Sequence, residues 1–81
     1  MYYISTEYSD DLFTEWTSAW NKSKSLIDQG FDFSIWVDKH KVFQKIGSEY
    51  IIDIYDEYSP LCIDLVNLMQ NAVKYDICIG G

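Results

Sequence analysis

Carboxylates are the most numerous side chains in this sequence that could carry chemistry. One group of them is Asp53, Asp56 and Glu57, and hard divalent cations are bound by several such oxygens. The spacing of the three matches no calcium-binding loop, and a strand would point Asp53 and Asp56 to opposite faces. We therefore expect no metal site and no cofactor.

Acid–base and nucleophilic chemistry find little support among the other residues. His40 is the only histidine and stands between lysines in a predicted turn, without the carboxylate or hydroxyl neighbour that would make it a general base. No serine stands in a nucleophile elbow, and Gly47-Ser48 is a turn rather than a phosphate cradle. The sequence thus predicts a protein that is not an enzyme, with His40 on its surface.

Trp16 and Trp20 have the spacing of one face of an amphipathic helix, together with Phe13 and Ile27. An aromatic stripe of this kind is typical of a helix packed on a core. The same two rings could instead form a platform for a small ligand. The core interpretation is favoured, and the ligand platform stays open as its alternative.

A period-two alternation predicts strands with one wet face in the middle of the chain. The apolar positions are Phe31, Phe33, Ile35 and Val37, and then Tyr50, Ile52 and Ile54. If these side chains face the helices, the intervening ones share the opposite face. Exposed Trp and Tyr among acids mark an interaction site, because these aromatics dominate binding hot spots. The predicted partner-binding residues are Asp32, Ser34, Trp36, Asp38, Ile51, Asp53, Tyr55 and Glu57.

Local signals place the remaining elements. Ser9-Asp10-Asp11 offers an N-cap and two acids for a helix over residues 10–29, which Gly30 would end. Ser59-Pro60 begins a second, broadly apolar helix. A turn is expected over Asp38–Lys41, although a helical turn within residues 35–46 competes with it. Strands are predicted at Met1–Thr6, Phe31–Asp38, Val42–Ile46, Tyr50–Glu57 and Tyr75–Ile79.

These elements predict one α+β domain over residues 1–81 with the order β-α-β-β-β-α-β. The short connection at Gly47-Ser48 favours a hairpin, so the sheet should be mostly antiparallel, with four to five strands. Both helices should pack on one face of this sheet.

Charge is the strongest compositional signal. Thirteen acidic residues oppose six basic ones, all of them lysine, for a net charge of −7. Direct binding to nucleic acid is not expected on this basis, because it requires cations that replace the counterions on the phosphates. A basic protein partner fits better, and acidity that serves only solubility is the alternative.

The chain shows no sign of export or membrane insertion. Cys62 and Cys78 lack the spacing of a metal or redox motif and are expected to be buried thiols. The N-terminus has no leader pattern, and no apolar run approaches the ~20 residues that span a bilayer. We expect a cytoplasmic monomer or homodimer, located in the host cytoplasm if the gene is carried by a phage.

Small size, acidity, absence of Arg and lack of catalytic groups together resemble the general run of small phage or mobile-element inhibitors and of nuclease immunity proteins. The leading hypothesis is a nucleic-acid mimic of the anti-restriction or anti-CRISPR type. It would block the basic channel of a host nuclease or defence complex and be retained by Trp36 and Tyr55. The alternatives are an immunity protein or antitoxin that neutralises a cognate toxin, and a small-ligand sponge built on Trp16 and Trp20.

Overall fold

The protein is an α+β domain with both helices on one face of a six-stranded sheet. The computed structural model describes residues 1–54, 60–68 and 74–79, the last of these by their backbone alone. The elements run in the order β1 (Tyr2–Thr6), β2 (Asp10–Phe13), α1 (Trp16–Gln29), β3 (Phe33–Val37), β4 (His40–Ile46), β5 (Glu49–Ile54), α2 (Pro60–Leu68) and β6 (Lys74–Ile79).

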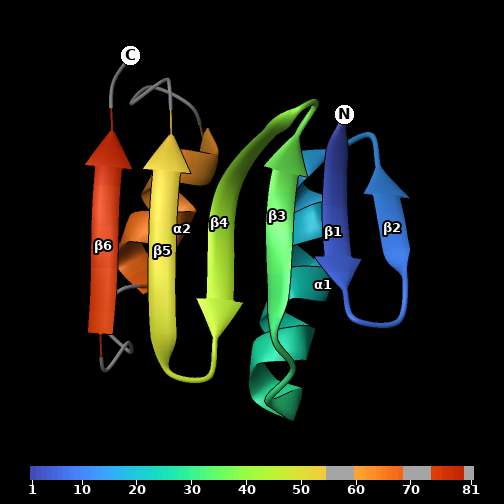
Figure 1. Ribbon diagram of the computed structural model, residues 1–81. Coiled ribbons are helices and arrows are strands. Elements are labelled where there is room, and N and C mark those ends of the chain that lie inside the picture. The colour runs from blue at the N-terminus through green and yellow to red at the C-terminus, as the bar shows by residue number, and fades with distance from the viewer. Residues whose placement is uncertain (55–59, 69–73, 80–81) are drawn as a thin grey trace.

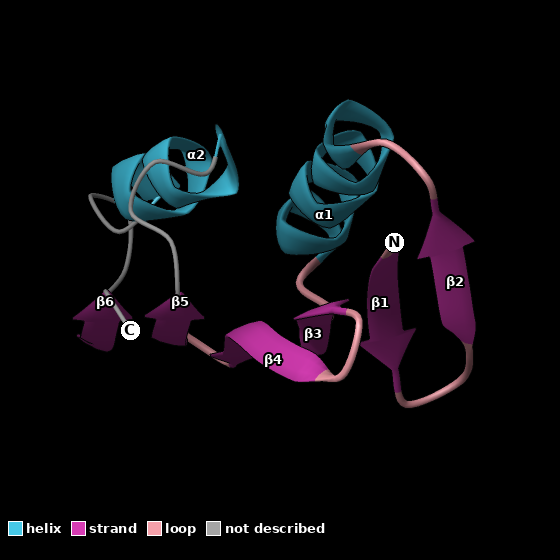
Figure 2. Cartoon of the chain, turned by 90° about the horizontal axis from the view of Figure 1, so that it is seen from above, coloured by secondary structure: helices cyan, strands magenta, loops and turns pink. Residues whose placement is uncertain are grey.

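The strands lie side by side in the order β2-β1-β3-β4-β5-β6 (Figure 1). Every neighbouring pair is antiparallel except β5 and β6, which are parallel. A parallel pair needs a crossover, and α2 lies between these two strands along the chain. The predicted class, the mostly antiparallel sheet and the placement of the helices on one face are confirmed, and Figure 2 shows both helices above the same side.

The first helix begins later than predicted, and the sheet gains a strand. The Thr6 hydroxyl accepts hydrogen bonds from the backbone N–H groups of Tyr8 and Ser9, at 3.2 and 3.1 Å. This turn folds Asp10–Phe13 back along β1, where Asp10 pairs with Ser5. The predicted N-cap at Ser9-Asp10-Asp11 is therefore wrong, because those residues form a turn and a strand. The helix starts at Trp16 and, as predicted, ends at Gly30, whose φ is 79°.

The core lies between the helices and one face of the sheet. One row of paired residues crosses four strands and is at most 1% exposed: Ile4, Ile35, Phe43 and Ile52. Helix α1 adds Trp16, Ala19 and Leu26 to this core, and α2 adds Leu61, Cys62 and Leu65. The predicted inward positions are confirmed at Phe33, Ile35, Tyr50, Ile52 and Ile54, whereas Phe31 precedes β3 and is exposed.

The turn between β3 and β4 is shorter than predicted. Val37 pairs with His40, so only Asp38 and Lys39 connect the two strands. Asp38 has a φ of 54°, a conformation that Asp tolerates better than most residues. His40 and Lys41 therefore belong to β4, and the competing helical turn does not form.

Candidate interaction surface

The candidate site is the sheet face opposite the helices, which we call the open face. Among the described elements, none covers it in Figure 2. Pairing across β1–β5 defines two rows of side chains on this face, because directly opposed residues share a face. One row is Leu12, Tyr3, Trp36 and Lys41, and the other is Asp10, Ser5, Ser34, Gln44 and Ile51.

Trp36 lies at the centre of the first row. Its neighbour Ile35 is fully buried against the helices, so the predicted opposite sense of the two side chains is confirmed. The indole Nε1 donates a hydrogen bond to Ser34 Oγ at 3.0 Å. Lys41 Nζ lies 5.9 Å from the ring centroid. These contacts leave the side chain half-buried, which is less exposed than the alternation alone suggested.

A register shift between β3 and β4 allows this arrangement. Ile35 pairs with Phe43 but Trp36 pairs with Lys41, so Val42 is an extra residue on β4. In such a bulge, two consecutive residues of one strand lie opposite a single residue of the other strand. Val42 and Phe43 are both buried as a result, while Lys41 stays beside Trp36 on the open face.

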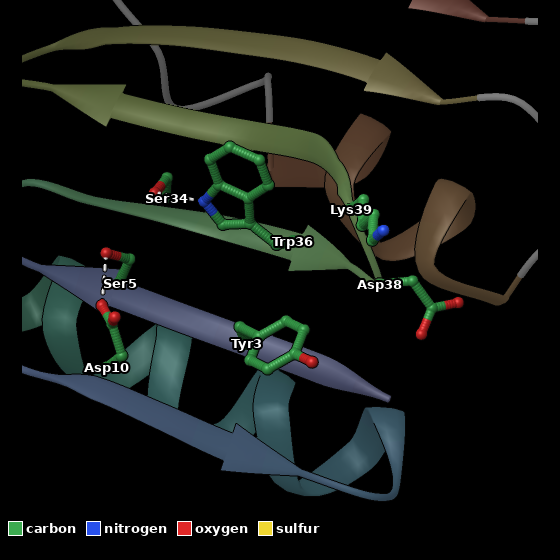
Figure 3. Close-up of a pocket in the computed structure, with 7 residues that line it drawn as sticks. All are labelled: Tyr3, Ser5, Asp10, Ser34, Trp36, Asp38 and Lys39. Atoms are coloured by element: carbon green, nitrogen blue, oxygen red, sulfur yellow. Dashed lines mark hydrogen bonds between the residues drawn. The ribbon is translucent and has the colours of Figure 1, made fainter.

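A shallow hollow of about 410 Å³ lies beside Trp36 (Figure 3). Tyr3 and Ser5 of β1 line it opposite Ser34 and Trp36 of β3, and the two aromatic rings stand on either side. Asp10 of β2 lies at one end, and the turn residues Asp38 and Lys39 lie at the other. The hollow therefore has an aromatic side chain on each side and a carboxylate at each end.

Comparisons with protein-family models, with curated proteins and with solved structures found no match for this chain. The chemistry of the open face is therefore the basis for a functional assignment. In the part of the chain that the structure describes, neither helix is long and apolar enough to span a bilayer. Within those same residues, no three His, Cys, Asp or Glu side chains gather in a way that could hold a metal ion.

The predicted site residues divide into three groups. Ser34, Trp36, Ile51 and Asp53 all lie on the open face, as their alternation along β3 and β5 requires. Asp32 and Asp38 flank β3 but lie outside it, because the strand spans only Phe33–Val37. Tyr55 and Glu57 lie outside the described residues.

Asp32 is engaged within the chain, away from the predicted row. Its Oδ1 accepts a hydrogen bond from Gly47 N–H at 2.8 Å and lies 3.6 Å from Lys45 Nζ. Lys45 is buried on the helix side of β4, where it pairs with Phe33 and Tyr50. Burial also raises the pKa of the Tyr50 phenol. Asp32 thus balances a buried charge and holds the β4–β5 turn.

Asp38 and His40 also have partners inside the chain. Asp38 Oδ1 lies 3.6 Å from the amino group of Met1, and its side chain is largely exposed. His40 is half-buried in β4, with its Nε2 2.9 Å from the main-chain oxygen of Asp53 and 3.8 Å from Oδ1 of the same residue. The prediction that His40 belongs to the turn is wrong, because the turn ends at Lys39 and His40 is the first residue of β4.

Four residues that line the hollow were missed in the sequence: Tyr3, Ser5, Asp10 and Lys39. The alternation Tyr2-Tyr3-Ile4-Ser5 already contained the signal for the first two, since Ile4 is the buried residue of β1. Asp10 could not be found in this way, because its place beside Ser5 depends on the hairpin that the Thr6 turn creates.

Replacing Asp32 with alanine should destabilise the fold by about 1–3 kcal/mol, because Lys45 would keep a buried charge without its carboxylate and Gly47 N–H would lose its acceptor. Urea denaturation would measure the change. The double variant Asp32→Ala/Lys45→Met should recover part of the loss, since it also removes the buried charge. A single variant that is as stable as the parent would show that Asp32 has no structural role.

Proposed function

We propose that this chain is a non-enzymatic, stoichiometric inhibitor that covers the basic nucleic-acid-binding surface of a nuclease or defence complex. The open face would be its contact surface. The protein would act in the cytoplasm of the cell that holds its partner, and a phage or mobile element is the kind of genome that would carry it.

The observation that carries the proposal is the composition of the open face. Trp36 and Tyr3 stand on neighbouring strands of a face that also presents Asp10 and Asp53. Trp and Tyr are enriched among the few residues that carry most of the binding energy of protein interfaces, whereas surface acids supply steering and selectivity. Because the net charge of the chain is −7, the whole molecule, and not only the open face, attracts a basic partner.

The size of the sheet is suited to this role. The chain measures 31 × 30 × 19 Å along its principal axes, so its broad faces are large compared with its thickness. A stable protein complex buries about 800 Å² on each partner. The open face alone can supply an area of that order.

The mechanism would be occupation of the phosphate track. A channel that binds nucleic acid carries a positive potential, which draws an acidic protein to it and accelerates association. Once docked, the sheet would exclude the nucleic acid sterically, and Trp36 would slow dissociation by packing into the channel wall. No reaction on the partner is required.

The contacts of the two helical tryptophans favour the core interpretation over a ligand platform. Trp16 stacks on Trp20 with ring centroids 5.6 Å apart, and its Nε1 donates a hydrogen bond to Asp64 Oδ2 at 2.8 Å. The Trp16 ring therefore packs against another ring of the chain, and its indole N–H has a hydrogen-bond acceptor within the chain.

Affinity capture from the source cell, followed by a competition assay, tests the proposal. In the absence of the inhibitor, the captured protein should bind nucleic acid. It should lose that binding when one equivalent of the inhibitor is added. Association of the two proteins should also slow as salt rises toward about 0.15 M, where charges are screened beyond about 8 Å. A captured partner that keeps its full nucleic-acid affinity in the complex would contradict the proposal. If the captured protein is a toxin that the inhibitor blocks at a site remote from any nucleic-acid-binding surface, this result would favour the immunity-protein alternative.

A further inference from the structure

The hollow beside Trp36 has two aromatic walls and one open side. Tyr3 pairs directly with Trp36 across β1 and β3, and Lys41 pairs with Trp36 from β4. The two neighbours therefore lie on opposite sides of Trp36. The Lys41 amine already lies near the ring, whereas the Tyr3 side borders the hollow.

The two ends of the hollow differ in charge. At one end, Asp10 Oδ1 accepts a hydrogen bond from Ser5 Oγ at 2.6 Å, which leaves its second carboxylate oxygen for another donor. At the other end, Asp38 is next to Lys39 and lies 3.6 Å from the positive amino group of Met1. The anionic end of the hollow is therefore the Asp10 end.

We infer that this hollow binds the guanidinium group of an arginine on a protein partner. The planar group would stack between the Trp36 and Tyr3 rings and donate N–H bonds to the Asp10 carboxylate. This inference deepens the proposed function, on which it rests for the nature of the partner. It gives the contact surface a specific anchor for a basic protein.

Arginine fits this hollow better than other cations. A guanidinium is flat, stacks on aromatic faces and directs its donors in the plane toward a carboxylate. A lysine ammonium is a strongly hydrated point charge, and a quaternary ammonium has no N–H to donate to Asp10. A cation over an aromatic ring gains about 0.5–1 kcal/mol at an exposed site, so the hollow selects for charge as well as shape.

The arginine must come from another protein. The sequence of this chain contains no Arg, so a second copy cannot supply the group. Two copies would also bring together surfaces that each belong to a chain with a net charge of −7. Charge complementarity therefore points to a basic protein as the occupant.

The test uses N-acetyl-arginine amide as the probe and N-acetyl-citrulline amide, its neutral isostere, as the matched control at equal ionic strength. Titrations would be followed by the ¹⁵N–¹H signals of the backbone and of the Trp indoles, with Trp36 identified by Trp36→Phe. The arginine probe should shift Trp36, Tyr3 and Ser5 in a saturable manner. Citrulline should bind about five- to tenfold more weakly, because it lacks the charge.

Variants of the chain locate the charge. Asp10→Asn should lower the affinity for the probe by about two- to fivefold, the range expected for an exposed ion pair. Asp53→Asn removes the same charge from the open face outside the hollow and should leave the affinity near that of the parent. Lys39→Ala should raise the affinity, because it removes a competing cation.

Three results would overturn the inference: equal binding of arginine and citrulline, binding of N-acetyl-lysine amide as tight as that of the arginine probe, or equal effects of Asp10→Asn and Asp53→Asn. The probe experiment needs no natural partner, so it is independent of the competition assay. Failure of the probe with a successful competition would remove only the arginine anchor. Binding of the probe with a failed competition would remove only the proposed inhibition.

Discussion

Replacing Trp16 with alanine should destabilise the domain by about 3–5 kcal/mol, the usual cost of deleting a large aromatic side chain from a core. Trp16 is 8% exposed and packs against Tyr2 and Trp20, with ring centroids 5.5 and 5.6 Å away. Its indole also joins α1 to α2 through Asp64. Domains of this size have about 5–15 kcal/mol of stability in total, so the variant should be close to unfolding.

Urea denaturation, monitored by circular dichroism, would measure this loss of stability. Trp20→Ala is the matched control, since Trp20 is only half-buried at the edge of the core and should cost about 1–2 kcal/mol. Trp16→Phe keeps most of the ring volume, removes the indole donor and leaves Asp64 without its partner. An equal loss of stability at Trp16 and Trp20 would contradict the deeper burial of Trp16.

The central strands could be predicted because their alternation is tied to burial. Phe33 and Ile35 on β3, and Ile52 and Ile54 on β5, are all buried at the predicted faces. A shift of one residue in either strand would turn these buried side chains to solvent. Register was therefore strongly specified by the sequence wherever one face met the helices.

The N-terminal hairpin could not be predicted, because two local signals competed. Ser9-Asp10-Asp11 has the composition of a helix start, yet an upstream hydroxyl that accepts backbone N–H groups can form a turn there instead. The Thr6 hydroxyl does so, and pairing with β1 then outweighs helix capping. The helix that follows has Glu15 at its N-cap position without a side-chain cap bond.

Only part of the candidate site could be predicted, because only some of its residues lie inside a regular strand. Trp36 and Ser34 could be placed from period two alone, because they lie inside a regular strand. Asp32 and Asp38 could not, because β3 begins after one and ends before the other. Their carboxylates instead find Lys45 and the Met1 amine, contacts that depend on which elements meet in three dimensions.

Replacing Trp36 with alanine should lower partner affinity by about 2 kcal/mol or more, which is about a 30-fold increase in Kd. The effect on stability should be smaller, about 1 kcal/mol, because the side chain is half-buried on a face that no described element covers. The lost Nε1 hydrogen bond leaves only the rotatable Ser34 hydroxyl, which water can satisfy. Binding and folding should therefore respond very differently to this one change.

The most direct test of the open face as the contact surface compares Trp36→Ala with Ile63→Ala against the captured partner. Ile63 is an apolar side chain on α2 that is 63% exposed, on the opposite layer of the molecule. Both variants should keep the far-ultraviolet spectrum of the parent, and Kd would be measured by calorimetry. We predict parental affinity for Ile63→Ala and at least about a 30-fold loss for Trp36→Ala. A folded Trp36→Ala variant that binds as tightly as the parent would contradict the account.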